Sequence, residues 1–297
     1  MLAKWEHITE DEILDANINK YNDDNIVNFY ADFEEPRYSY HEYEVIIQAL
    51  INALHSSLGH NVRAVDICGG TGKAAFVVKK CNSCCQVTLV DVSRKMLDIA
   101  RLKAKRLGVK ELNIVQADAF GFLAREEEYD LIIFSSAIHH FKDPCKLLCA
   151  AAQRLSPEGM IVTIADPTIL IRSKRYKMFE FVFINFAGKK KILQDLFFKS
   201  KKNDSDDPQW DIAEYQALKG IDDKSLARQL YALGLQPLVH MRYPAGEPYM
   251  TKIMPLIGLN WAFSLILRRS DHDKNHELAR ELKKQFKAGL RFKFQLL

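Results

Sequence analysis

A glycine-rich loop separates an apolar segment from a segment that contains no helix breaker. Residues 62–67 are mostly apolar, as in a buried strand, and Lys73–Lys80 favour a helix. Glycines allow a tight turn and a close approach of a ligand to the backbone, and a helix N-terminus attracts anionic groups. A strand, a glycine loop and a helix in this order are typical of a nucleotide-cofactor site. The candidate loop residues are Gly69, Gly70, Thr71 and Gly72.

Asp91 is the second residue with a chemical role, because it ends a predicted strand about 20 residues after the loop. A carboxylate at this place can accept hydrogen bonds from both hydroxyls of a ribose. Gly70–Ala75 also fits the G-x-G-x-x-A pattern of dinucleotide sites. The loop and Asp91 alone therefore do not exclude a nicotinamide cofactor.

Three further features decide between the cofactors. Asp66 lies inside the end of the first strand, where it can anchor the loop or the amino group of a methionine moiety. Asp118 and Ala119 follow a third strand, where they can contact adenine, although Asp118 can also be a helix N-cap. Ser135–His140 occupies the exit over the fourth strand that a second nucleotide would need. Together these features favour S-adenosylmethionine.

The elements that position these residues alternate between strands and helices. Near-continuous apolar strands that alternate with helices indicate a parallel sheet covered on both faces. We therefore expect an α/β, Rossmann-like, doubly wound fold. The predicted strands are residues 62–67, 86–90, 112–116, 129–134, 160–165, 235–243 and about 260–268.

The order and spacing of these motifs resemble the class I S-adenosylmethionine-dependent methyltransferases, in particular the ubiquinone/menaquinone C-methyltransferase-like small-molecule type. The resemblance covers about residues 60–167 well and the final strands loosely. It is carried by residues 65–72, 90–97, 117–119, 129–130 with Ser135, 139–144 and 155–159.

The resemblance implies a seven-stranded sheet with an antiparallel last strand and S-adenosylhomocysteine as product. It places Gly70, Thr71 and Gly72 at the methionine and ribose and Asp91 at the ribose hydroxyls, with Val92 as a further cofactor-binding residue. It also implies that Asp118 and Ala119 contact adenine and that Ser135 lies beside the sulfonium. Cys68 departs from the glycine that many relatives have at its position.

His139 and His140 are the candidate catalytic residues. A histidine with a pKa near neutrality could remove a proton from the acceptor as the methyl group arrives. The alternative is that both are packed, hydrogen-bonded histidines without a catalytic role.

Residues 171–202 contain ten Lys or Arg and two acidic residues, a net charge of +8. Tyr176, Phe179 and Phe183 share one helical face in this segment, and an insertion after the fifth strand of this fold lies above the ligand. We expect a lid with an aromatic inner face, the alternative being a face that packs on the core or on a second subunit. With Tyr30 of an aromatic N-terminal run, these three residues are the candidate substrate-binding residues.

The composition fits an ordinary globular protein. Of 297 residues, 48% are hydrophobic and 27% charged, with a net charge of +4. No apolar run reaches the ~18–20 residues of a membrane span, and the first twelve residues do not resemble a secretory signal. Six cysteines without a second pair at metal-site spacing favour reduced thiols and no metal. We expect a cytoplasmic protein. The sequence leaves open whether it forms a homodimer.

We predict four regions: an N-terminal helical cap (1–58), a Rossmann-like core (59–169 and 221–270), a helical lid insertion (170–220) and a basic C-terminal helical tail (271–297). The predicted function is in-line methyl transfer from S-adenosylmethionine to a small molecule with an apolar or aromatic part, which can be anionic. The alternatives are an RNA methyltransferase, although no nucleic-acid-binding module is recognisable, and an NAD(P)-dependent oxidoreductase.

Overall fold

The computed structural model describes residues 7–32, 37–178, 212–213, 219–244, 251–252, 254–270 and 274–297. Phe179 and Phe183, the centre of the expected lid face, lie outside the described residues, as does most of the segment 170–220.

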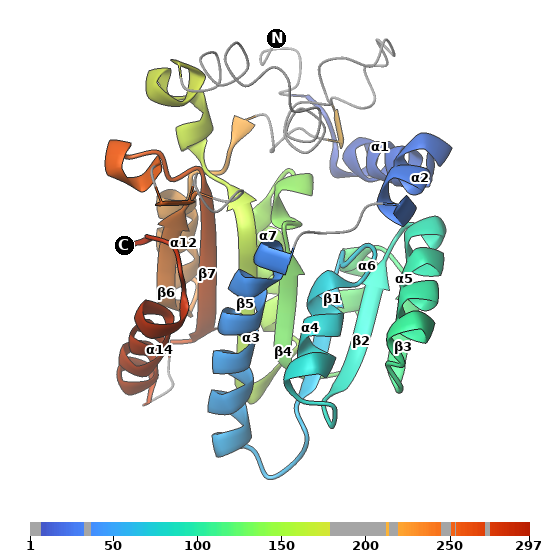
Figure 1. Cartoon of the computed structure of the whole chain (residues 1–297), viewed down its shortest axis with the longest axis horizontal. Coiled ribbons are helices and arrows are strands. Elements are labelled where there is room, and N and C mark those ends of the chain that lie inside the picture. The colour runs from blue at the N-terminus through green and yellow to red at the C-terminus, as the bar shows by residue number, and fades with distance from the viewer. Residues whose placement is uncertain are drawn as a thin grey trace.

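One eight-stranded sheet organises the chain, in the order β3-β2-β1-β4-β5-β7-β6-β8 (Figure 1). The pairs β1–β2, β1–β4, β2–β3 and β4–β5 are parallel, whereas β7 runs antiparallel to both β5 and β6. The strands are β1 Arg63–Ile67, β2 Gln86–Asp91, β3 Leu112–Gln116, β4 Tyr129–Ser135, β5 Leu155–Pro167, β6 Leu235–Tyr243, β7 Ala262–Arg269 and β8 Gln295–Leu296.

The α/β fold class with an antiparallel last long strand is confirmed, and the expected strand number of seven is wrong by one. The additional strand, β8, comprises two residues that pair antiparallel with Met241 and Arg242 of β6. A pairing of two residues leaves too short a pattern of alternation to be recognised in a sequence.

Helices cover both faces of the sheet. On one face, α3 (Arg37–Ser57), α4 (Lys73–Cys81), α5 (Arg94–Leu107) and α14 (Asn275–Gly289) contribute to one apolar cluster. On the other, α6 (Ala119–Leu123), α7 (Pro144–Ala152) and α12 (Asp223–Ala232) form a second cluster with the strands. Because both faces of β1, β4 and β5 are covered, consecutive residues along them are buried, namely Ala64–Ile67, Leu131–Phe134 and Met160–Val162.

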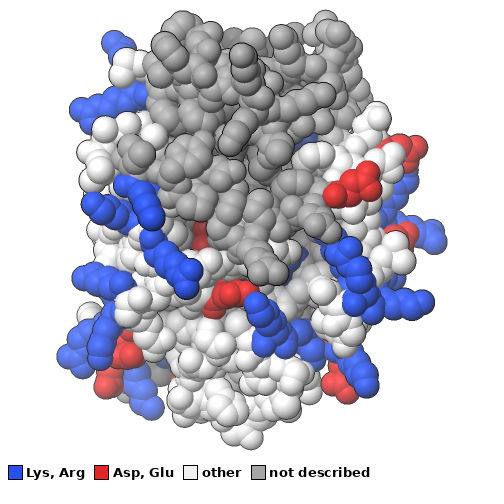
Figure 2. All heavy atoms as spheres, in the orientation of Figure 1, with Lys and Arg blue, Asp and Glu red and all other residues white. Residues whose placement is uncertain are grey.

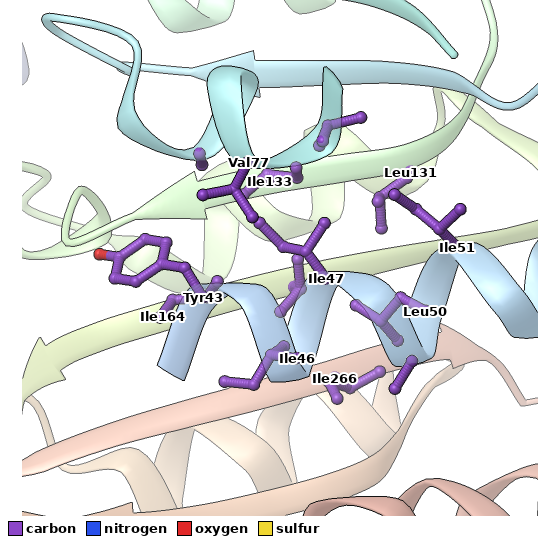
Figure 3. Packing of buried hydrophobic residues seen from close by; sticks show 14 of the residues in the cluster. Tyr43, Ile46, Ile47, Leu50, Ile51, Val77, Leu131, Ile133, Ile164 and Ile266 are labelled. Carbon is purple, nitrogen blue, oxygen red and sulfur yellow. The ribbon is translucent and has the colours of Figure 1, made fainter. Parts of the chain in front are cut away.

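The helix α3 is the largest contributor to the first cluster. Figure 3 shows Ile46, Ile47, Leu50 and Ile51 directed toward strand residues that include Ile133. All four α3 residues are at most 2% exposed. Residues 37–57 of the segment expected to be a cap therefore belong to the layer of helices on the sheet.

The first two helices, α1 (Glu10–Asn22) and α2 (Asp24–Asp32), lie beside the N-terminal end of α5 (Figure 1). This is the carboxyl edge of the parallel strands, where ligands bind in open α/β sheets. Within the described ranges, no helix combines the length and the apolar character needed to cross a bilayer.

The C-terminal segment expected to be a basic helical tail is partly a core element. Leu282 and Phe286 of α14 are fully buried, and His41 Nε2 of α3 lies 3.1 Å from the carbonyl oxygen of Gly289. The charged residues of α14 lie on its outer side, as the 3.6-residue period of an amphipathic helix requires.

Candidate functional site

The loop between β1 and α4 is shaped by close packing on one side and open space on the other. A Cβ at Gly69 would lie 2.4 Å from Leu89 Cδ1 and 2.6 Å from Asp66 Cγ, so only glycine fits there. Gly70 has φ +54°, and a Cβ at that position would meet no atom within 4 Å. The loop therefore presses against the sheet at Gly69 and leaves room for a ligand over Gly70.

Cys68 also adopts a left-handed conformation, with φ +56°. A non-glycine residue in this region costs roughly 1–2 kcal/mol. This backbone geometry agrees with the glycine that the resemblance implies at this position, and it shows that a small side chain is accommodated. Burial raises the pKa of the Cys68 thiol well above its usual value, so the thiol is protonated and a weak nucleophile.

Asp66 anchors the beginning of α4. Its Oδ2 accepts a hydrogen bond from the backbone N–H of Ala75 at 3.0 Å, whereas its Oδ1 is buried without a partner among the described residues. Burial, with a smaller contribution from the charge of Asp91, raises the pKa of Asp66 to about 7. One carboxylate oxygen is thus satisfied by the fold, and the other is left for a donor that the described residues do not supply.

Asp91 joins the glycine loop to the next helix. Its Oδ2 accepts from the N–H of Gly70 and its Oδ1 from the N–H of Ser93, both at 2.8 Å. Burial raises the pKa of Asp91, and these hydrogen bonds oppose the shift. Each oxygen has a further lone pair, so the carboxylate can still accept from the two hydroxyls of a ribose.

Thr71 and Val92 complete the loop region. Thr71 Oγ1 accepts from Lys103 Nζ of α5 at 3.1 Å, and the carbonyl of Val92 accepts from Gln116 Nε2 at 3.2 Å. These contacts tie the loops after β1 and β2 to neighbouring elements.

Asp118 is the N-cap of α6, because its Oδ1 accepts from the N–H of Gly121 at 2.8 Å. The alternative of a capping role is therefore confirmed. The neighbouring Ala119 is buried and begins α6. Both residues lie after β3 at the carboxyl edge. Their contact with an adenine ring stays a prediction.

Ser135 ends β4 and donates through Oγ to the hydroxyl of Tyr43 at 3.0 Å. Figure 3 shows the ring of Tyr43 extending from α3 beside Ile164. The ammonium of Lys73, the first residue of α4, lies 4.3 Å from the centroid of the Tyr43 ring. These contacts bring the first turns of α3 and α4 together at the end of β4.

His139 and His140 follow in a short 3-10 helix, Ile138–His140, and their rings lie 4.1 Å apart. His139 Nδ1 lies 2.9 Å from Oδ1 of Asp166, the last residue but one of β5. His140 Nδ1 lies 3.0 Å from the carbonyl oxygen of Ala213, and its Nε2 lies 3.4 Å from the hydroxyl of Tyr21. The two candidates therefore differ, since His139 pairs with a buried carboxylate and His140 with neutral groups.

Helices α1 and α2 connect the loop after β2 to the loop after β4. Ser93 Oγ donates to the carbonyl of Tyr21 at 2.7 Å, and Lys95 pairs with Asp24 at 2.5 Å. At the other end, the carboxylate of Glu10 accepts from the backbone N–H of Asp143 at 3.0 Å. The two helices thus span the carboxyl edge from β2 to β4.

The two described candidate aromatic residues, Tyr30 and Tyr176, have different neighbours. Tyr30 lies 6.3 Å from Tyr21, whose ring makes an edge contact with His140 at 5.6 Å. Tyr176 instead makes an edge contact with Trp261 at 5.8 Å and packs against the core cluster of α3. Among the described residues, Tyr30 is thus near the histidines, whereas Tyr176 lies against the core.

A buried polar network that the sequence analysis did not identify lies at the ends of β5, β6 and β7. Tyr243 donates to the carboxyl group of Glu42 and contacts Ser264 Oγ at 2.7 Å, and the N–H of Ala165 donates to the Tyr243 hydroxyl at 3.1 Å. Burial raises the pKa of Glu42 to about 7. The sequence analysis also did not identify Asp166 as a site residue. Its position near the end of a predicted strand, like the positions of Asp66 and Asp91, was a signal that could have identified it.

Charges on the outside are mixed. Figure 2 shows Lys and Arg side chains of described residues interspersed with acids along the flanks of the viewed face. Within the described ranges, no three His, Cys, Asp or Glu residues come together in a way that could hold a metal ion.

Residues 65–163 match a family model described as a methyltransferase domain. The ubiquinone/menaquinone biosynthesis C-methyltransferase of Edwardsiella ictaluri is 30% identical over 130 residues, which are 42% of this chain and 52% of that protein. The enzyme of the same name from Psychromonas ingrahamii is 29% identical over 141 residues, 45% of this chain and 55% of that protein. The chain thus spans about half the length of the curated relatives it matches.

Two solved structures share the fold over most of the chain. A plantazolicin methyltransferase in complex with S-adenosylhomocysteine superposes with a TM-score of 0.56 at 15% identity, covering 90% of this chain and 97% of the other. The magnesium protoporphyrin IX methyltransferase of Synechocystis PCC 6803 with bound S-adenosylhomocysteine has a TM-score of 0.53 at 10% identity, covering 87% and 100%. At these identities the likeness concerns the fold.

Proposed function

We propose that residues 65–163 form a class I S-adenosylmethionine-dependent methyltransferase domain and that the chain uses it to methylate a small molecule. The cofactor supplies an electrophilic methyl group on a sulfonium. The observation that supports the proposal is the open position at Gly70, where an added Cβ would meet no atom within 4 Å and the N–H donates to the carboxylate of Asp91.

The residues at the carboxyl edge fit the parts of the cofactor. The buried Oδ1 of Asp66 has no partner among the described residues and would accept a hydrogen bond from the amino group of the methionine moiety. The carboxylate of Asp91 would accept from the ribose hydroxyls. Gly69, Thr71 and Gly72 would also contact the methionine moiety of the cofactor.

The other predicted contacts follow from the order of the strands. Asp118 and Ala119 after β3 would contact the adenine, beyond Val92 after β2, because β3 lies next to β2 in the sheet. Ser135 would lie beside the sulfonium, because β4 lies on the other side of β1. The acceptor would then approach over β4 and β5, under α1 and α2.

A small-molecule acceptor is supported by the relatives, which carry the name of a quinone-biosynthesis methyltransferase. The aromatic side chains of Tyr21 and Tyr30 beside His140 favour an acceptor with an apolar or aromatic part. For Phe179 and Phe183 the lid role stays a sequence prediction.

Calorimetric titration with S-adenosylhomocysteine tests the cofactor assignment. We expect the wild-type chain to bind it and Asp91→Asn to bind it roughly 10- to 100-fold more weakly, because hydrogen bonds to a charged group contribute about 1.5–3 kcal/mol. Asp98→Asn is the matched control, since Asp98 is an exposed acid on α5 that pairs with Arg101. Equal affinities of both variants, or binding of NADH in place of S-adenosylhomocysteine, would contradict the proposal.

A further inference from the structure

We propose that one surface of the chain, the docking face formed by residues 169–178 and 254–257, binds to an anionic lipid bilayer. The partner is the bilayer itself, with its negatively charged phospholipid headgroups and the hydrocarbon below them. The inference goes beyond the proposed function and does not depend on it, because the docking face contains none of the residues assigned to the cofactor.

The two segments of the docking face lie against each other at the carboxyl edge of the sheet (Figure 1). The backbone N–H of Thr168 donates to the carbonyl of Trp261 at 2.8 Å, and the ring of Tyr176 makes an edge contact with Trp261 at 5.8 Å. A Cβ added at Gly258 would lie 3.5 Å from a terminal guanidinium nitrogen of Arg175. The segment after β5 and the segment before β7 therefore form one continuous surface.

Four large apolar side chains of the docking face are exposed. The exposed fractions are 68% for Leu256, 65% for Met178, 50% for Ile257 and 38% for Ile169. Ile171 and Tyr176 of the first segment instead pack against the core cluster of α3, so the core already holds the inner side of this segment. A single exposed apolar side chain is ordinary, whereas neighbouring ones with a polar surround mark a surface that contacts a membrane or another protein.

Positive charge surrounds these apolar side chains. The exposed cations within the docking face, or two residues before its second segment, are Arg172, Lys174, Arg175, Lys177 and Lys252. Both segments lack acidic residues, and none of the five cations forms an ion pair within the described part of the chain. In Figure 2, Lys and Arg side chains project at the upper left, where Figure 1 places the segment after β5. Their charge is therefore available to an anionic partner.

The mixture of side chains favours a bilayer over nucleic acid. Proteins bind single-stranded nucleic acid through cations on the phosphates and aromatic rings on the bases, whereas the exposed apolar side chains here are Leu, Ile and Met. Aliphatic side chains enter the boundary between headgroups and acyl chains, and neighbouring Lys and Arg are attracted to anionic headgroups. The long stems of Lys and Arg allow both contacts at once, because they lie along apolar surface while the charge stays in water.

Sedimentation of the whole chain with lipid vesicles tests the proposal. We expect binding to vesicles of phosphatidylcholine and phosphatidylglycerol in equal parts, and roughly tenfold or more weaker binding to phosphatidylcholine alone. Raising the salt concentration toward 1 M should weaken binding to the mixed vesicles, because the Debye length falls from about 10 Å to about 3 Å. Equal binding to the two kinds of vesicle, or binding to neither, would overturn the proposal.

Two groups of substitutions separate charge from apolar contact. Removing three cations by Arg172→Gln, Lys174→Gln and Lys177→Gln should weaken binding to the mixed vesicles by roughly 100-fold, about fivefold for each cation. Removing two apolar side chains by Leu256→Gln and Ile257→Gln should weaken it by roughly tenfold or more and leave the salt dependence in place. Either variant binding as tightly as the wild type would contradict the docking face.

The matched control combines Leu102→Gln with Lys105→Gln, which removes an exposed apolar side chain and an exposed cation from α5. This variant should bind vesicles as the wild type does. All substituted positions are exposed, so the thermal midpoints should stay close to that of the wild type. A loss in the control as large as that in the docking-face variants would show that binding follows total charge and overturn the assignment to this face.

Two other partners give results of their own. Tighter binding of single-stranded RNA than of the anionic vesicles, lost in the charge variant, would assign the face to nucleic acid and overturn the proposal. A dimer of the chain that dissociates in the apolar variant, without vesicle binding, would assign it to a second copy and overturn it as well. Titration with S-adenosylhomocysteine is a separate measurement, so a failure of the proposed function would leave the vesicle result unchanged.

Discussion

Replacing Asp66 with asparagine should stabilise the unliganded protein increasingly as the pH rises. Burial raises the pKa of this carboxyl from 3.8 to about 7. The folded state therefore holds the proton more tightly than the unfolded state, and stability falls as the pH rises from 3.8 to about 7. Asparagine can still accept from the N–H of Ala75, and it cannot ionise.

The magnitude follows from linkage. With these two pKa values, ionisation of Asp66 costs about 2 kcal/mol of folding free energy at pH 5 and about 4 kcal/mol at pH 8. The difference in unfolding free energy between Asp66→Asn and the wild type should thus increase by about 2–3 kcal/mol between pH 5 and pH 8.

Urea denaturation of both proteins at pH 5, 6, 7 and 8 measures this difference. Buried acids that do not interact with Asp66 titrate alike in both proteins, so their contributions cancel in the comparison. A stability difference that stays constant over this range would refute the reasoning. S-adenosylhomocysteine should bind the variant more weakly, because the amino group of its methionine part would lose a charged acceptor.

Three further substitutions have structural reasons of different kinds. Cys68→Val should lower the unfolding free energy by roughly 1–3 kcal/mol, because a β-branched residue suits a φ of +56° poorly; an unchanged thermal midpoint would contradict this. Leu50→Ala should cost about 2–5 kcal/mol in urea denaturation, since Leu50 is fully buried, whereas Leu102→Ala at a 70% exposed position should cost little. Asp223→Ala should cost about 3–5 kcal/mol, because it leaves the buried Arg242 without its carboxylate; a loss below 1 kcal/mol would argue against a buried ion pair.

The strands and the glycine loop could be predicted from the sequence because their signals are local. Residues 235–243 were expected as a strand and form β6 with these bounds. The loop after β1 has its signal in three glycines within four residues, and Asp66 and Asp91 stand at the ends of the apolar runs that precede them. Turn chemistry and side-chain alternation act over a few residues, so each can be read without knowing the fold.

The place of α3 was harder to predict. Its apolar pattern indicated a helix, but an amphipathic stripe is the same on a cap and on a sheet-covering helix. Only the contacts of Ile46, Ile47 and Leu50 with the strands show which surface the stripe covers. The two-residue strand β8 was missed for a related reason, since its pairing depends on β6 and leaves no local pattern.

The sequence by itself determined the donor side of the site, because the glycines and the acids that end β1 and β2 belong to local motifs. The tertiary structure decided which polar groups meet. It pairs His139 with Asp166, 27 residues away, and Glu42 with Tyr243, 201 residues away. Strand order and helix packing bring these partners together, and no local propensity records such a contact.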